Sequence, residues 1–255
     1  MIGMMYYADL LKLEVFNLAD AEKIVGSLEN AKAILNSYAK KGIIKRVRRN
    51  LYYAVNLENK EAPANRYLVA SKINDGAYLT HHSAFEVHGL SHQISFVAYV
   101  ASNQRISDFE FEGVLYKYVR GGINEGVIRY HLNEGIKMTD LERTVIDSMD
   151  RLDYCGGPHE LDEILKICPV LDEGKLFNYL KAYNKQVLYK KAGYFLERHQ
   201  QSLGISDDFL AAIEKRTGNT RKYLSEEALN GNGVLMNRWG LIVPKTFQVR
   251  NDIFV

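Results

Sequence analysis

Cysteine, proline and long apolar runs are scarce in this sequence. The two cysteines, Cys155 and Cys168, are too few for a disulfide framework or a four-cysteine zinc site. Reduced thiols in a cytoplasmic protein are the expectation, with a single bridge between them as the alternative. The longest apolar run, at about residues 94–101, is far shorter than the ~20 residues that cross a bilayer, and Asp9 and Lys12 interrupt any signal-peptide core. We therefore expect neither a membrane span nor secretion.

The composition is typical of an ordinary globular protein. Of the 255 residues, 47% are hydrophobic and 25% are charged, which excludes a disordered or collagen-like chain. At roughly 100–200 residues per domain, this length predicts one large domain or two smaller ones. The 33 basic and 31 acidic residues nearly balance, so only the local distribution of charge is informative about partners.

Positive charge is concentrated in one short segment, residues 30–56. The segment has no acidic residue and carries +7, while the rest of the chain together carries −5. Clustered lysine and arginine side chains release counterions from a phosphate backbone, which makes this segment a candidate surface for a polyanion. The alternative is a charged face that meets only solvent. The seven cations are Lys32, Lys40, Lys41, Lys45, Arg46, Arg48 and Arg49.

Two helices joined by a tight turn are predicted at this segment. Residues 18–25 are predicted to form a short helix that ends at Gly26, because glycine adopts a left-handed turn at little cost. Ser27 then offers an N-cap oxygen to a second helix, over about residues 28–41, which ends at Gly42. A helix, a turn with glycine and a second helix make a helix-turn-helix.

The second helix is predicted to be amphipathic. Its apolar residues Ala31, Ile34, Leu35 and Tyr38 recur at helical spacing and form one buried stripe. The opposite face is small and polar, as a helix that reads a DNA groove requires. That face holds Glu29, Ala33, Asn36, Ser37 and Lys40, with Lys32 on its flank.

A basic β-hairpin is predicted to follow, from two β-prone runs at 43–47 and 51–55 that turn near Arg49-Asn50. A helix-turn-helix followed by a basic hairpin is a winged helix, whose second helix enters the major groove while the wing contacts phosphates or the minor groove. Duplex DNA is favoured because A-form RNA hides its major groove, and docking of a protein is the alternative. Asn36 could pair with adenine. The predicted DNA-binding residues are Lys32, Asn36, Ser37, Lys40, Lys45, Arg46, Arg48 and Arg49.

The order of these motifs along the chain resembles the AbiEi family, the antitoxins and transcriptional repressors of type IV toxin–antitoxin systems. The likeness is good over the first 150 residues and loose beyond them. It departs at Asn50, where such proteins usually have glycine. The segments that carry the likeness are Asp20-Ala21-Glu22, the helix after Ser27, and residues 48–53, 67–72, 78–90 and 139–147.

The resemblance implies two functions that no spacing in the sequence shows. The N-terminal winged helix would repress its own operon by binding inverted repeats in the promoter. The remainder of the chain would neutralise a nucleotidyltransferase-like toxin, in this class often without a stable complex. The operator repeats and the toxin are therefore expectations from the resemblance, and no cofactor is implied.

A linker at 58–64 is predicted to divide the chain into a winged-helix domain over 1–58 and a larger α+β domain over 65–255. The fold class is therefore α+β. The expected elements of the larger domain are a helix at 66–73, a helix from a Thr80 cap to Gly89, a strand at 94–101, a hairpin at 109–119 turning at Glu112-Gly113, strands within 126–138, helices from about 160, and an irregular tail or short strand at 239–255.

Four clustered histidines suggest a metal site, but their spacing argues against one. His81 and His88 would lie about 10.5 Å apart along one helix, too far to share an ion. Gly89 is expected to end that helix before His92 can join it. We therefore expect capping or partly buried imidazoles at His81, His82, His88 and His92, and no metal.

Other motifs that suggest an enzyme have structural interpretations. Thr139 and Glu142 fit a capping box, which accounts for Glu142 without catalysis. The glycines of residues 121–126 lack the spacing of a phosphate loop. We expect no catalytic residue and no cofactor. The alternative is a DNA-processing enzyme, such as a nuclease, that uses the winged helix to deliver its substrate.

Overall fold

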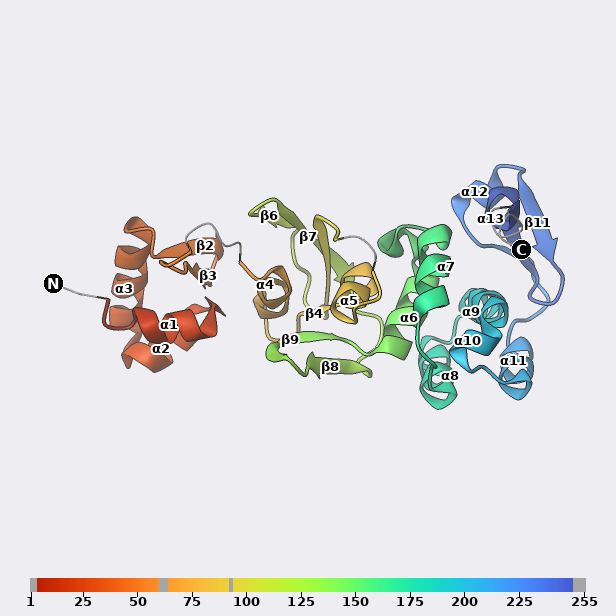
Figure 1. Ribbon diagram of the computed structural model, residues 1–255, viewed down its shortest axis with the longest axis horizontal. Helices are drawn as coiled ribbons and strands as arrows, with labels where there is room; N and C mark the ends of the chain where they lie inside the picture. Colours follow the sequence, from red (N-terminus) through yellow and green to blue (C-terminus); the bar gives the residue numbers. More distant parts are fainter. Residues whose placement is uncertain (1–3, 60–63, 92–93, 250–255) are drawn as a thin grey trace. The chain divides into compact units, whose positions relative to one another are not determined.

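The computed structural model describes residues 4–59, 64–91 and 94–249, and it is an α+β protein as predicted (Figure 1). Contacts divide the chain into two compact units. The first comprises the residues up to 79 with 95–120 and 128–138, and the second comprises the remainder. The two units do not divide at the predicted linker, residues 58–64. The predicted domain boundaries, 1–58 and 65–255, therefore stay a prediction. None of the described helices is long and apolar enough to cross a membrane.

The N-terminal part of the first unit consists of three helices and a small antiparallel sheet. Its strands pair in the order β1-β3-β2. The helices predicted at 18–25 and 28–41 are present, the second one residue shorter than expected, and so is the predicted hairpin. The elements are α1 Tyr7–Leu13, β1 Val15–Phe16, α2 Leu18–Val25, α3 Leu28–Lys40, β2 Ile44–Arg48 and β3 Leu51–Ala54.

Capping residues explain where α2 ends and α3 begins. Asn17 and Asp20 each accept a hydrogen bond from the other's backbone N–H, at 3.0 Å, and form a capping box at the start of α2. Gly26 ends α2 in the left-handed region with φ 84°. Ser27 then accepts a hydrogen bond from the backbone N–H of Asn30 at 3.5 Å, at the start of α3. The turn between the two helices is therefore set by local signals, as predicted.

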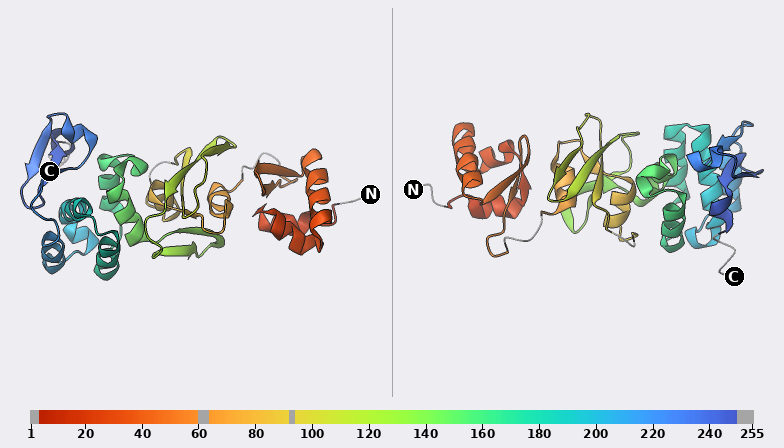
Figure 2. Two further views of the ribbon diagram at one scale, coloured as in Figure 1. Left: turned by 180° about the vertical axis from the view of Figure 1, so that it is seen from behind. Right: turned by 90° about the horizontal axis from the view of Figure 1, so that it is seen from above.

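A mixed six-stranded sheet and the helix α4 complete the first unit (Figure 2). The strand order is β6-β7-β5-β4-β9-β8, in which β5 is parallel to β7 and β4 is parallel to β9. The turn between β6 and β7 lies at Glu112 and Gly113, as predicted, and both have positive φ. The elements are α4 Arg66–Lys72, β4 Tyr78–Leu79, β5 Val97–Ser102, β6 Phe109–Phe111, β7 Val114–Arg120, β8 Val127–Tyr130 and β9 Asn133–Thr139.

The second unit is mostly helical. The helices predicted from about residue 160 are present, but the chain does not stay helical: β10, β11 and β12 form a small sheet in the order β10-β12-β11. These strands have only two to four residues, too few for alternation to reveal them. The predicted tail at 239–255 contains β12 and α13, and residues 250–255 lie outside the described residues. The elements are α5 His81–Val87, α6 Leu141–Asp150, η1 Leu152–Cys155, α7 Pro158–Ile167, α8 Glu173–Tyr183, α9 Gln186–Arg198, α10 Gln200–Leu203, α11 Asp207–Glu214, β10 Lys222–Tyr223, α12 Glu226–Leu229, β11 Gly233–Met236, β12 Leu241–Pro244 and α13 Lys245–Val249.

The single tryptophan of the chain packs this small sheet against α9. Trp239 is 1% exposed, and Gly193 in α9 leaves room for its ring, since a Cβ at that position would lie 2.2 Å from the indole. The indole Nε1 donates a hydrogen bond to Glu197 at 2.6 Å. Glycine inside a helix costs about 1 kcal/mol relative to alanine, and the close packing of the indole offsets that cost.

A buried arginine in α6 joins separate segments of the second unit. Arg143 is 1% exposed, and its Nε donates a hydrogen bond to Asp147 at 2.6 Å. Its guanidinium also donates to the backbone carbonyl oxygens of Ile123 and Glu125, at 3.2 and 2.6 Å. The glycine-containing loop at 121–126 is therefore held in place by Arg143.

Asp147 accepts hydrogen bonds from two further elements. Tyr183 in α8 donates its hydroxyl at 2.5 Å, and Thr80 Oγ1 donates at 3.0 Å. The side-chain cap predicted for Thr80 is therefore wrong, although α5 begins directly after it and stops before Gly89 as expected. A buried carboxylate requires several donors, and Thr80 supplies one of them instead of capping its own helix.

The capping box predicted at residues 139–142 is also wrong, because the N-cap of α6 lies one residue later than expected and Glu142 does not cap the helix. Asp140, not Thr139, is the N-cap of α6 and accepts a hydrogen bond from the backbone of the first helical turn at 2.8 Å. Glu142 instead accepts from the backbone N–H of Asp172 and from Lys175 Nζ, each at 3.1 Å. Thr139 and Asp140 both carry an oxygen that can cap, so the sequence pattern alone does not distinguish them.

Both cysteines are buried and unbridged, and burial raises the pKa of Cys155 and of Cys168 to about 12. Because the thiolate is the reactive form of cysteine, these thiols are poor nucleophiles at neutral pH.

We expect Arg143→Met to lower the free energy of unfolding by about 3–5 kcal/mol, because it leaves the Asp147 carboxylate buried without its cation. Arg151→Met is the matched control, since Arg151 pairs with Asp153 at the surface, where such pairs contribute about 0–1 kcal/mol. Urea unfolding followed by circular dichroism measures both losses. Equal losses in the two variants would contradict a stabilising role for the buried pair.

Candidate nucleic-acid interface

Helix α3 presents the face that the sequence predicts. The four residues of its apolar stripe are all buried, at most 5% exposed. On the opposite side Lys32, Asn36 and Lys40 are exposed and Ser37 is half-buried. The helix is thus attached to the first unit by one face and leaves a polar, basic face open. The stripe consists of Ala31, Ile34, Leu35 and Tyr38.

Asn50 connects the hairpin turn to the start of α2. Its φ of 61° lies in the left-handed region, which asparagine tolerates better than most residues. Its side-chain Oδ1 accepts a hydrogen bond from the backbone N–H of Leu18, the first residue of α2, at 3.1 Å. A glycine would supply the backbone conformation without that hydrogen bond. The sequence indicates the turn, but the contact with Leu18 depends on the fold.

The hairpin β2–β3 exposes three of the predicted cations. Lys45, Arg46 and Arg49 are exposed, while Val47 between them is buried. The pairing with β3 shifts between Arg46 and Arg48, and such a bulge re-aims side chains relative to a regular strand. The two consecutive basic residues that precede this shift, Lys45 and Arg46, are both exposed.

Two of the predicted cations contact the β6–β7 hairpin of the same unit. Lys45 forms an ion pair with Glu112, which lies 67 residues away in the sequence. The Arg48 guanidinium lies 4.9 Å from the ring centroid of Phe109, and its Nη1 is buried with no hydrogen-bond partner among the described residues. Arg48 is consequently half-buried, and the charge of Lys45 is partly neutralised. Neither contact has a local signal in the sequence.

The other five cations of the basic segment are exposed and form no ion pair within the part of the chain that the structure describes. The Nε of Arg46 donates to the backbone carbonyl of Arg48 at 3.3 Å, a bond to a neutral group that leaves its charge unbalanced. Unpaired cations on a surface attract counterions that a polyanion can displace. These five residues are Lys32, Lys40, Lys41, Arg46 and Arg49.

A hydrogen-bonded chain of His81, Thr80 and Asp147 in the second unit differs from a catalytic triad. Thr80 Oγ1 lies 3.0 Å from His81 Nδ1 and 3.0 Å from Asp147, so the hydroxyl stands between the imidazole and the carboxylate instead of at one end. All three residues are buried, and burial lowers the pKa of His81. This arrangement therefore offers no accessible nucleophile.

No group of three or more histidine, cysteine, aspartate and glutamate side chains that could hold a metal occurs among the described residues. His81 and His82 are buried, and the ring of His88 lies 2.9 Å from the carbonyl oxygen of Thr139. His92 lies outside the described residues.

Comparisons with known proteins bear on the fold alone. No family model matches the chain. No curated protein matches it either. Among solved structures, the crystal structure of the RV2827C protein from Mycobacterium tuberculosis is similar, with a TM-score of 0.65 and 14% sequence identity over 99% of this chain and 96% of that chain. The two chains therefore share a fold over nearly their whole lengths.

We expect Asn50→Ala to destabilise the protein more than Asn50→Gly. Both variants lose the hydrogen bond to Leu18, worth about 0.5–1.5 kcal/mol, but only alanine also pays about 1–2 kcal/mol for a left-handed backbone. Urea denaturation of the full-length variants provides the comparison. If the two losses were equal, the left-handed turn would not constrain this position.

Proposed function

We propose that residues 7–54 form a winged helix that binds double-stranded DNA, with α3 in the major groove and the β2–β3 turn as the wing. The observation that carries this proposal is the exposed face of α3, where Lys32, Asn36 and Lys40 lie opposite a fully buried apolar stripe. A helix of this kind reaches base edges while cations on an adjacent hairpin contact phosphates. Arg46 and Arg49 are the exposed hairpin cations without an acidic partner among the described residues.

We further propose that the protein is a regulator and not an enzyme, namely an autorepressing antitoxin of a type IV toxin–antitoxin system. The support is the resemblance to the AbiEi family, whose motif at residues 139–147 here forms the start of α6 and contains the buried pair of Arg143 and Asp147. On this proposal the DNA is an operator with inverted repeats in the protein's own promoter. The functional partner is a nucleotidyltransferase-like toxin in the cytoplasm. Absence of such a toxin from the neighbouring reading frame would count against the proposal.

We expect the double variant Arg46→Gln plus Arg49→Gln to weaken binding to every duplex and to flatten the salt dependence. Each phosphate contact contributes about 0.9 to the slope of log K against log salt, so the slope should fall by up to about two units. Fluorescence anisotropy with a labelled duplex at several salt concentrations measures the slope. An unchanged slope would remove the hairpin from the interface.

Two matched variants separate a local effect from a change in total charge. Arg105→Gln plus Arg120→Gln removes the same charge from exposed positions outside the hairpin and should leave the slope unchanged. Glu112→Gln releases Lys45 and should steepen the slope by up to about one unit. The labelled duplex should also remain intact with Mg²⁺ present, whereas cleavage would favour the nuclease alternative.

We expect Asn36→Ala to cost roughly 1–3 kcal/mol of binding free energy on the cognate site only, because a bidentate contact to a base discriminates by about that amount. Asn237→Ala, at an exposed asparagine of the second unit, is the matched control and should leave the affinity for both duplexes unchanged. Affinities for the promoter duplex and for a scrambled duplex are measured for both variants. Equal losses on the two duplexes would show that Asn36 positions the protein without reading sequence.

A further inference from the structure

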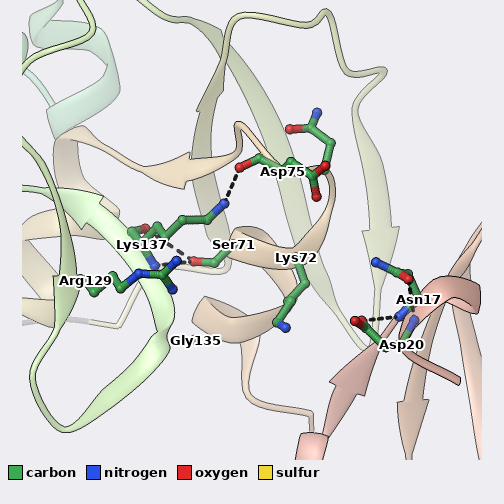
Figure 3. Close-up of a pocket in the computed structure, with 9 residues that line it drawn as sticks. Asn17, Asp20, Ser71, Lys72, Asp75, Arg129, Gly135 and Lys137 are labelled. Atoms are coloured by element: carbon green, nitrogen blue, oxygen red, sulfur yellow. Dashed lines mark hydrogen bonds between the residues drawn. The ribbon is translucent and has the colours of Figure 1, made fainter. Parts of the chain in front are cut away.

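The first unit contains a polar cavity that the proposed DNA-binding surface leaves unexplained (Figure 3). Its volume is about 290 Å³, and it lies among the end of α4, the strands β8 and β9, and the start of α2. Three basic side chains, Lys72, Arg129 and Lys137, line it from three different elements. The other lining residues are Asn17, Asp20, Ser71, Asn74, Asp75 and Gly135.

Hydrogen bonds to backbone carbonyl groups hold two of these cations, Lys137 and Arg129, in place. Lys137 Nζ donates to the backbone carbonyl of Asp75 at 2.5 Å, and Arg129 donates to that of Glu134 at 2.8 Å. Ser71 Oγ donates to the carbonyl of Lys137 at 3.2 Å and accepts from its N–H at 2.9 Å, which fixes the strand against α4. The side chains of Arg129 and Lys137 are therefore positioned without being neutralised.

The charges in the cavity are unbalanced. Burial and the neighbouring Arg129 lower the pKa of Lys137, and Lys72 adds to this effect while Asp75 opposes it. None of the three cations forms an ion pair within the described ranges. The three cations outnumber the two lining carboxylates, those of Asp20 and Asp75, and the Asp20 carboxylate already accepts the backbone N–H of Asn17 in the capping box of α2. A bound anion would remove the repulsion among the cations.

We propose that this cavity binds a small phosphorylated molecule, whose phosphate is held by Lys72, Arg129 and Lys137. Guanidinium and ammonium groups are the donors that phosphate oxygens prefer in proteins. Pockets for drug-sized ligands span about 300–1,000 Å³, and this cavity, at about 290 Å³, lies just below that range and suits a smaller, metabolite-sized ligand. The polar lining disfavours an apolar ligand. Asn74 Oδ1 already accepts hydrogen bonds from Gly76 and Ser102, which leaves its amide Nδ2 to donate to a ligand hydroxyl group.

Isothermal titration calorimetry of the full chain with pyrophosphate and with inorganic phosphate, at ionic strength held constant with chloride, tests this proposal. We expect saturable binding at one site per chain. Lys72→Gln plus Arg129→Gln should weaken it at least tenfold, whereas Arg105→Gln plus Arg120→Gln should leave it unchanged. Lys72→Gln alone is the milder second variant, and circular dichroism verifies the fold of each. Lys137 is retained because its bond to the backbone of Asp75 is part of the fold.

Two outcomes would overturn the proposal. The first is absence of saturable binding of either anion by the unmodified chain. If the variant of Lys72 and Arg129 then also loses affinity for duplex DNA, the cavity receives a phosphate of the DNA backbone instead. The second is equal weakening in the control variant. This test is independent of the proposed DNA binding. If the chain binds pyrophosphate but no DNA duplex, the proposed function fails and the anion site stands.

Discussion

The buried guanidinium of Arg143 is the interaction on which the second unit depends. It connects α6 with the loop at 121–126 through two backbone carbonyls, and it balances Asp147, which in turn accepts hydrogen bonds from Thr80 and from Tyr183 in α8. A charge this deep is tolerated only when its donors are almost all satisfied. The segment at 139–147 therefore specifies how distant parts of the chain meet.

In the first unit, the display of positive charge depends on short-range contacts. The capping box at Asn17 and Asp20, the left-handed Gly26 and the bond from Leu18 to Asn50 fix α2, α3 and the hairpin relative to one another. The same unit also limits that display, because Glu112 and Phe109 engage Lys45 and Arg48. The candidate surface consequently consists of the exposed face of α3 and the hairpin turn, and not of all seven cations of the basic segment.

Features with a local physical cause could be predicted from the sequence, and features with a distant partner could not. Gly26, Ser27 and the pair Glu112-Gly113 carry their signal within a few residues, and the structure has turns or caps at each. The sequence did not identify Asp140 as the N-cap of α6, because Thr139 next to it carries an equivalent oxygen. In the structure the hydroxyl of Thr139 forms a hydrogen bond with the hydroxyl of Thr144 instead.

Distance along the chain accounts for the other failures. The parallel strand pairs, the ring of Phe109 next to Arg48 and the three cations around the cavity all join residues far apart in the sequence. Of the candidate site, the exposed face of α3 could be derived from helical spacing, while the partial neutralisation of Lys45 depends on Glu112, 67 residues away in the sequence. The short strand allowed for at 239–255 is present as β12, whereas β10 and β11 were missed because they are shorter than the window in which periodicity can be detected.

The packing of Trp239 on Gly193 has a practical consequence. The chain has a single indole, which is almost fully buried and hydrogen-bonded to Glu197. All tryptophan emission therefore comes from the contact between the terminal sheet and α9. Detachment of the terminal sheet would move the ring into water and shift its fluorescence to the red, even while the remaining helices stay folded. The protein thus contains an intrinsic optical probe for partial opening of its C-terminal end.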